Sequence, residues 1–301
     1  MKIGVIVPQG WTGEFRGWKP DEAWARTRDV AWQAESLGFE SIWAFDHFHT
    51  TPRPTLEITF ESFTTLAALV PETRRVRLGH VVLCAAYRNP ALTAKMISTL
   101  DVISGGRMEL GIGAGWKRDE WLAYGYGFPG APERLAILRE QLEIIIALMG
   151  DEPATYHGER HHVDRAINRP LPLQRPRVPI MVGGNGPNVT WRLAARYADE
   201  LNLDGMSPSE VAEALPVIRR RCDEIERDPA SLAVSVHAWW ESLSESGPTR
   251  AELVAAYREL GVSRLIALVR ESADSDEALA SWAEDARAGG AELLESHALG
   301  A

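Results

Sequence analysis

Residues 89–116 read NPALTAKMISTLDVISGGRMELGIGAGW, and this stretch decides the fold. Asn89 can cap a helix that begins at Pro90, because proline loses no hydrogen bond at that position. Apolar side chains then recur at spacings of three and four, and Asp101 interrupts them. The predicted buried face of this helix consists of Leu92, Met96, Leu100 and Ile103. Two glycines at 105–106 end the helix, and a strand at 108–113 runs into a glycine-rich mouth at 113–116.

The alternation of strand and helix continues on both sides of this stretch. We expect strands at 2–7, 39–45, 76–84, 108–113, 178–183, 201–203, 232–240 and 264–269. Helices are expected at 20–37, 57–70, 90–104, 132–149, 188–197, 207–227, 249–260 and 274–288. Eight such units without a shorter repeat favour a closed (β/α)8 TIM barrel, formed by one domain over residues 1–301, over an open doubly wound sheet.

Two segments are too long for plain connections and are interpreted as insertions. Residues 117–130, after the fourth strand, are aromatic and rich in glycine, which is typical of a lid or a pocket wall. Residues 150–178, before the fifth strand, contain a short alternating piece at 154–163. We interpret this second segment as an excursion from the barrel.

Composition excludes several classes of function. The formal net charge of −10 argues against a nucleic-acid surface, which needs a basic face. No segment has the length of a membrane span or the pattern of a signal peptide, so we expect a cytoplasmic protein that does not bind membranes. Cys84 and Cys222 differ in surroundings and predict no disulfide, and the three histidines at 157–162 lack the context of a metal site.

In a TIM barrel the functional residues follow the carboxyl ends of the strands. The fifth predicted strand is followed by Gly183, Gly184, Asn185, Gly186 and Pro187. A glycine-rich turn that leads into a helix presents free backbone N–H groups and the positive end of the helix dipole, which favours a phosphate site. The alternative is a plain turn between strand and helix.

Asp46 and His47 follow the second predicted strand. A neutral imidazole could exchange protons there, and the neighbouring carboxylate could bind the hydroxyls or nitrogens of a ligand. The alternative is a surface histidine beside a loop aspartate. Trp116, Trp239 and Trp240 could stack on a cofactor ring or could simply plug the barrel.

Four segments together resemble one known family: DHFH at 46–49, residues 88–116, the Y-x-G motif at Tyr156, and residues 178–205. They are similar to the bacterial luciferase-like family, in particular its branch that uses the 8-hydroxy-5-deazaflavin coenzyme F420. The resemblance covers about residues 1–205. It implies a (β/α)8 barrel, commonly a homodimer, that binds a deazaflavin or FMN and moves a hydride to or from it.

The resemblance also implies roles for single residues. His47 would be the catalytic proton donor, and Asp46 would hold the coenzyme. Ala114 and Gly115 would lie beside its ring system, and residues 183–187 would bind its phosphate. A non-proline cis peptide would lie around residues 80–83.

The function expected from this resemblance is an oxidoreductase that transfers a hydride between coenzyme F420 and a small organic substrate. One alternative is a luciferase-like monooxygenase that uses reduced FMN and oxygen. Another is a barrel that binds the coenzyme without turnover. Trp116 stands where the sugar-phosphate dehydrogenases of the branch have an acidic residue, so sugar-phosphate oxidation is not expected.

Overall fold

The computed structural model describes residues 1–243 and 245–295, and within them the strands form a closed parallel barrel. The strands of the barrel are β1 (Lys2–Ile6), β2 (Ser41–Ala44), β3 (Arg77–His80), β4 (Leu83–Cys84), β5 (Met108–Gly113), β8 (Ile180–Gly183), β9 (Glu200–Asp204), β10 (Ala233–Ala238) and β11 (Arg264–Ala267). The pairing of β1 with β11 and of β3 with β5 closes the ring. Because β3 and β4 together occupy one position, the barrel has eight positions in the described chain, and the predicted fold is confirmed.

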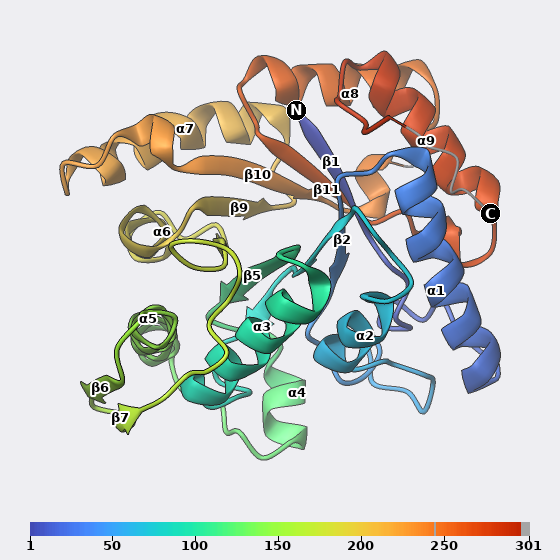
Figure 1. Cartoon of the computed structure of the whole chain (residues 1–301). Coiled ribbons are helices and arrows are strands. Elements are labelled where there is room, and N and C mark those ends of the chain that lie inside the picture. The colour runs from blue at the N-terminus through green and yellow to red at the C-terminus, as the bar shows by residue number, and fades with distance from the viewer. Residues whose placement is uncertain (244, 296–301) are drawn as a thin grey trace.

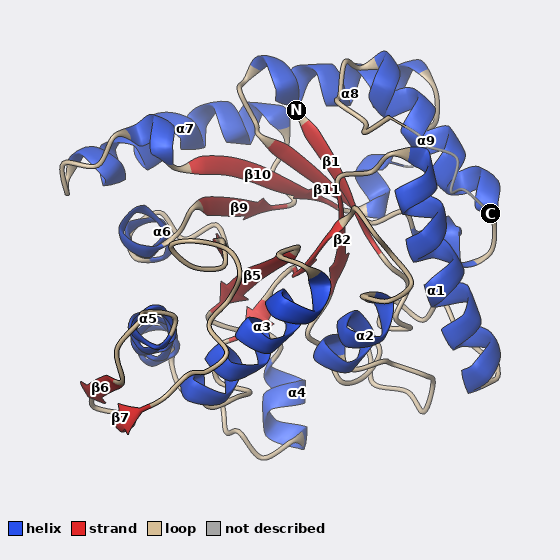
Figure 2. Cartoon of the chain, in the orientation of Figure 1, coloured by secondary structure: helices blue, strands red, loops and turns tan. Residues whose placement is uncertain are grey.

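Helices surround these strands, as Figures 1 and 2 show. The long helices are α1 (Pro20–Leu37), α2 (Ser62–Leu69), α3 (Pro90–Ser104), α5 (Ala131–Leu148), α6 (Thr190–Tyr197), α7 (Pro208–Asp223), α8 (Pro248–Glu259) and α9 (Asp276–Ala288). The large apolar core lies between the strands and this helical layer. A smaller cluster that includes Ile6, Trp43 and Ile266 fills the inside of the barrel.

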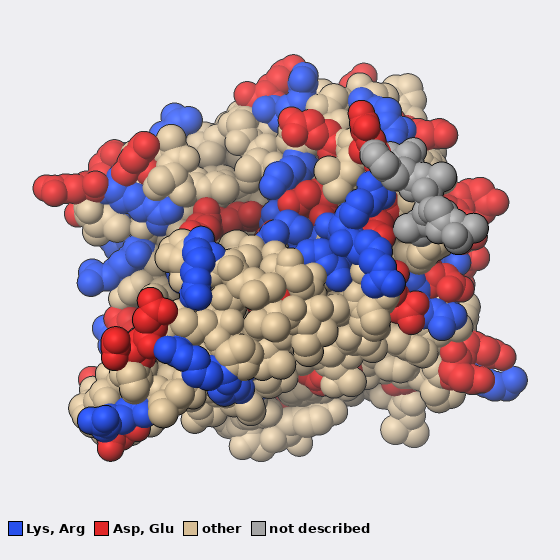
Figure 3. Space-filling model, viewed as in Figure 1, with Lys and Arg blue, Asp and Glu red and all other residues tan. Residues whose placement is uncertain are grey.

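Helix α3 begins and ends as the sequence predicts, but its buried face differs. The Asn89 side chain accepts a hydrogen bond from the backbone N–H of Ala91, and Gly105 ends the helix in the left-handed conformation. Leu92 and Ile103 are 51% and 62% exposed, so this half of the predicted buried face is wrong, whereas Leu100 is buried as predicted. The buried side also contains small and polar residues, including Asp101, and the surface over α3 carries few charges (Figure 3).

Asp101 is buried because a loop covers it. Its carboxylate accepts hydrogen bonds from the backbone N–H groups of Leu173 and Gln174 at 2.8 and 3.1 Å. The Gln174 side chain donates a third at 2.7 Å. A buried carboxylate with several donors is well satisfied, and here it fastens the segment before β8 to α3.

Several elements are shorter than expected, and two of them have a clear local cause. Helix α2 begins at Ser62 and not at 57, because the Glu61 side chain caps it by accepting from Phe63 N and Thr64 N. The third predicted strand is interrupted between β3 and β4 by a cis peptide bond that joins Val81 and Val82. This bond lies in the region where the family resemblance implies one.

Both predicted insertions have structure of their own. Residues 117–130 contain a short helix, α4 (Arg118–Ala123), that the sequence did not predict. Residues 150–178 contain an antiparallel hairpin of β6 (Ala154–His157) and β7 (His162–Ala166), which Figure 1 shows beside α5 and outside the barrel. Three short 3-10 helices complete the described elements at Pro229–Ser231, Trp240–Leu243 and Arg270–Ala273.

The amino-terminal end of the barrel is closed by a buried ion cluster. Arg264 on β11 contacts Glu109 at 2.7 Å, Glu200 at 3.0 Å and Glu40 at 3.2 Å. Burial raises the pKa of Glu109, but the charges of Arg264 and Arg77 outweigh burial and lower it overall. The cluster therefore links four strand positions through one guanidinium.

Cys84 and Cys222 are both buried free thiols. In the part of the chain that the structure describes, every helix is too short or too polar to cross a bilayer.

Candidate active site

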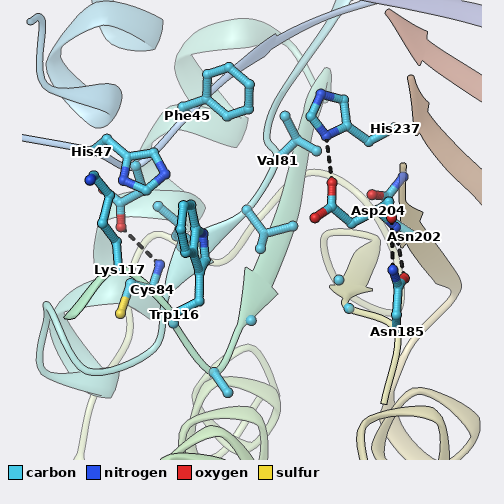
Figure 4. Close-up of a pocket in the computed structure, with 18 of the residues that line it drawn as sticks. Phe45, His47, Val81, Cys84, Trp116, Lys117, Asn185, Asn202, Asp204 and His237 are labelled. Atoms are coloured by element: carbon cyan, nitrogen blue, oxygen red, sulfur yellow. Dashed lines mark hydrogen bonds and ion pairs between the residues drawn. The ribbon is translucent and has the colours of Figure 1, made fainter. Parts of the chain in front are cut away.

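The carboxyl ends of the barrel strands surround a cavity of about 370 Å³. Ligand pockets in proteins commonly have volumes of about 300–1,000 Å³, so the cavity suits a small molecule or part of a coenzyme. Aromatic rings form much of its wall, from Trp11, Phe45, Tyr87, Trp116 and Trp239. Figure 4 shows His47 and Trp116 on one side of this cavity and Asp204 and His237 on the other.

His47 lines the cavity and is held in place from two directions. Its Nδ1 lies 2.8 Å from Oε2 of Glu120, a fully buried carboxylate on α4. Its ring stacks on Trp11, with centroids 4.1 Å apart and planes 5° apart. Because Glu120 occupies Nδ1, the Nε2 atom is the one left to exchange a proton with a ligand.

Sequence reasoning missed Glu120, which lies 73 residues after His47 in the unpredicted helix α4. Glu120 also accepts hydrogen bonds from Phe48 N at 3.1 Å and from the Tyr87 hydroxyl at 3.3 Å. These donors keep its carboxylate in place beneath the imidazole. The acidic pair at 119–120 was the available signal, but nothing in it indicates contact with His47.

Asp46 also lines the cavity, but its carboxylate is already occupied. Arg88 donates to both of its oxygens at 2.8 Å, Ser62 donates at 3.0 Å, and Cys84 N donates at 2.9 Å. Four donors leave little capacity for a ligand. The geometry therefore favours a positioning role for Asp46 over the predicted contact with the coenzyme.

Cys84 lies in the same wall, and its free thiol is buried. Burial is the main cause that raises the pKa of its thiol to about 12, so the thiol stays protonated at neutral pH.

The glycines of the mouth permit close packing around Val82. A Cβ atom on Gly113 or on Gly183 would lie 2.8 Å from a methyl group of Val82. Gly115 has a φ of +76°, and a Cβ there would lie 2.5 Å from Cys84 Sγ. Ala114, Gly115 and Gly183 line the cavity together with Val82, and their predicted contacts with a coenzyme remain a prediction.

The turn at 183–187 has the backbone geometry of an anion site. Gly184 N donates to Asn202 O at 3.0 Å, whereas the N–H groups of Asn185, Gly186 and Asn188 donate to none of the described residues. Free N–H groups before a helix favour an anion. Gly183, Gly184 and Asn185 line the cavity, but Gly186 and Pro187 do not.

A second histidine–carboxylate pair faces His47 across the cavity, and sequence reasoning missed it. His237, at the end of β10, places Nδ1 at 3.1 Å from Oδ1 of Asp204, at the end of β9. Trp239 donates from Nε1 to the same oxygen at 2.9 Å. Both partners lie at the carboxyl ends of barrel strands, which is the signal that could have located them.

The cavity offers little positive charge. Lys117 is the single Lys or Arg among the described lining residues, and its Nζ lies 3.0 Å from Asp119. A substrate phosphate would therefore find no free cation in this wall.

Comparison with known proteins identifies the family of this chain. The model of the luciferase-like monooxygenase family matches residues 1–300. The chain belongs to that family. An F420-dependent glucose-6-phosphate dehydrogenase of Kineococcus radiotolerans is 38% identical over 175 residues, which cover 57% of this chain and 50% of that protein. This chain thus spans about half the length of that relative.

Another relative and two solved structures match over longer stretches. An F420-dependent glucose-6-phosphate dehydrogenase of Intrasporangium calvum is 31% identical over 257 residues, which cover 78% of this chain and 74% of that protein. An F420-dependent secondary alcohol dehydrogenase, solved with an F420–acetone adduct, aligns with a TM-score of 0.77 at 19% identity over 93% of this chain and 98% of its own. The monooxygenase RslO1 of Streptomyces bottropensis aligns with a TM-score of 0.74 at 20% identity, over 95% of this chain and 98% of its own. At these identities the two structures establish the shared fold.

Proposed function

We propose that the protein is an oxidoreductase that transfers a hydride between coenzyme F420 and a small organic substrate. The observation that carries the proposal is His47, which faces an aromatic cavity and is held through Nδ1 by a buried carboxylate. The relatives named as F420-dependent dehydrogenases support the choice of coenzyme. Small uncharged substrates fit the cavity better than sugar phosphates, because Lys117 is already paired with Asp119.

The residues present fit a deazaflavin nucleotide. Gly113 and Gly183 let the Val82 side chain pack against them, since a Cβ on either would collide with it. Val82 then presents an apolar surface in the cavity wall, which suits a flat ring. The free N–H groups of Asn185 and Gly186 suit a phosphate at the end of β8. When bound, the coenzyme would supply the hydride donor or acceptor.

The protein's own residues would handle the proton and the surroundings of the reaction. His47 Nε2 would take the proton from a substrate hydroxyl in oxidation, or give one to a carbonyl oxygen in reduction. Glu120 would hold the imidazole in one orientation and stabilise its positive charge. The aromatic wall would keep water away from the reacting carbon.

The alternative is a monooxygenase that uses reduced FMN and oxygen. The family name and the likeness to RslO1 favour it, and both functions fit the same barrel. The second alternative is a barrel that binds the coenzyme without turnover. Such a protein would bind the coenzyme but would neither oxidise nor reduce it with any substrate.

Binding and turnover measurements separate these functions. We expect fluorescence titration to give a lower Kd for coenzyme F420 than for FMN. We also expect turnover with at least one small substrate, followed by the absorbance of the coenzyme. The oxidised coenzyme should lose absorbance with an alcohol from a panel, or the reduced coenzyme should regain absorbance with a ketone or enone. Neither reaction should consume oxygen. Tighter binding of FMN together with oxygen uptake would replace this proposal by the monooxygenase, and binding without turnover would leave a coenzyme-binding protein.

A further inference from the structure

The pair of Asp204 and His237 has no role in the proposed proton transfer, yet it forms one wall of the cavity. His237 and Trp239 both donate to Oδ1 of Asp204, at 3.1 and 2.9 Å. Burial raises the pKa of Asp204, but these two hydrogen bonds outweigh burial and lower it overall. Asp204 is therefore a carboxylate that is charged at neutral pH and fixed through one of its two oxygens.

The other oxygen, Oδ2, receives no hydrogen bond from any described residue. Figure 4 shows the Asp204 carboxylate on the cavity side of β9. The Asp204 side chain is 55% exposed, so Oδ2 is open to a ligand. Asp46, the other aspartate of the cavity wall, has four donors and no such free acceptor.

Asp204 is tied directly to the turn that we propose binds phosphate. The Asn185 side chain donates to Asp204 O at 2.7 Å and accepts from Asp204 N at 2.9 Å. Any ligand whose phosphate lies on this turn therefore passes close to Asp204. The carboxylate does not suit the phosphate itself, because two negative charges would repel each other.

A carboxylate acceptor suits neighbouring hydroxyl groups, as in the acidic residues that bind the ribose hydroxyls of dinucleotides. In deazaflavin and flavin coenzymes, a chain of hydroxyl groups joins the ring to the phosphate. We propose that Asp204, fixed by His237 and Trp239, binds the hydroxyls of this polyol chain. This inference rests on the proposed function, and it gives Asp204 the hydroxyl-binding role that the sequence suggests for Asp46.

The substitution Asp204→Asn tests this inference in the full-length protein. It keeps an oxygen acceptor for His237 and Trp239 but removes the charge and can place an N–H donor where Oδ2 lies. Asp199→Asn is the matched control, because Asp199 precedes the same strand at the opposite end of the barrel, where it pairs with Arg177. Circular dichroism and the Tm show whether each variant folds. If Asp204→Asn does not fold, Asp204→Ser takes its place.

Three ligands, titrated by fluorescence, locate the interaction. They are coenzyme F420, its phosphate-free fragment 8-hydroxy-5-deazariboflavin, and the 10-methyl ring analogue that lacks the polyol. Loss of a hydrogen bond to a charged group should raise the Kd of the first two about 10–100-fold. The Kd of the 10-methyl analogue should not change, and the Asp199→Asn protein should match the parent with all three.

The other outcomes overturn the inference in distinguishable ways. Unchanged Kd values in Asp204→Asn would show that the carboxylate does not contact the coenzyme. An equal loss with the 10-methyl analogue would place the effect at the ring. If the parent protein prefers FMN, only the proposed coenzyme is wrong, and FMN, riboflavin and lumiflavin then test Asp204 in the same way. If the parent binds neither the deazaflavins nor the flavins, both proposals are wrong.

Discussion

His80 is fully buried on β3, and neither of its ring nitrogens has a hydrogen-bond partner among the described residues. Burial is the main cause that lowers its pKa from 6.5 to about 3. Between about pH 6.5 and 3, His80 is therefore protonated in the unfolded chain but neutral in the folded protein. The free energy of unfolding should fall as the pH drops through this range, by up to about 1.4 kcal/mol per pH unit. Urea unfolding between pH 4.5 and 7.5 should show a shallower pH dependence in His80→Gln. The substitution His157→Gln, at an exposed histidine, should keep the slope of the parent. An unchanged slope in His80→Gln would mean that His80 binds its proton equally well in the folded and unfolded states.

Helix α4 is the element that makes His47 a candidate for chemistry, because it supplies Glu120. If His47 is the acid or base, His47→Ala should lower turnover about 10²–10⁴-fold and change the Kd of coenzyme F420 only a few-fold. His49→Ala is the matched control: His49 lies 3.8 Å from the same Glu120, but it does not line the cavity. Stopped-flow absorbance of the coenzyme with the best substrate of the panel measures both variants. Equal losses in the two would assign the effect to packing around α4, and parent rates in His47→Ala would leave the proton to another group.

At the scale of the whole molecule, Arg264 joins strand positions that are far apart in the chain through Glu40, Glu109 and Glu200. Removal of its charge would leave three buried carboxylates without their shared partner. Arg264→Met should therefore lower the free energy of unfolding by about 3–5 kcal/mol, as for other broken buried ion pairs. Arg192→Met, which removes an exposed pair with Glu224, should lower the free energy of unfolding far less, because water screens surface ion pairs. Urea unfolding at pH 7 compares the two, and equal costs would show that the cluster contributes no more than a surface pair.

The sequence by itself determined the order of the barrel strands and of the helices between them, apart from α4, because periodicity, caps and glycines act over a few residues. Asn89 and Gly105 bound α3 as predicted. The carboxyl ends of the strands located His47 and the turn at 183–187, since both directly follow a strand. The family resemblance predicted the region of a non-proline cis peptide, which lies between Val81 and Val82.

Only the tertiary structure decided which groups meet. The side of α3 that faces the core depends on what covers the helix, so Asp101 is buried under residues 173–174 while Leu92 is exposed. His47 meets Glu120 across 73 residues, and Asp204 meets His237 across 33. Such contacts arise because the barrel brings the ends of separate strands to one rim, and no local pattern records which side chains then lie within hydrogen-bonding distance.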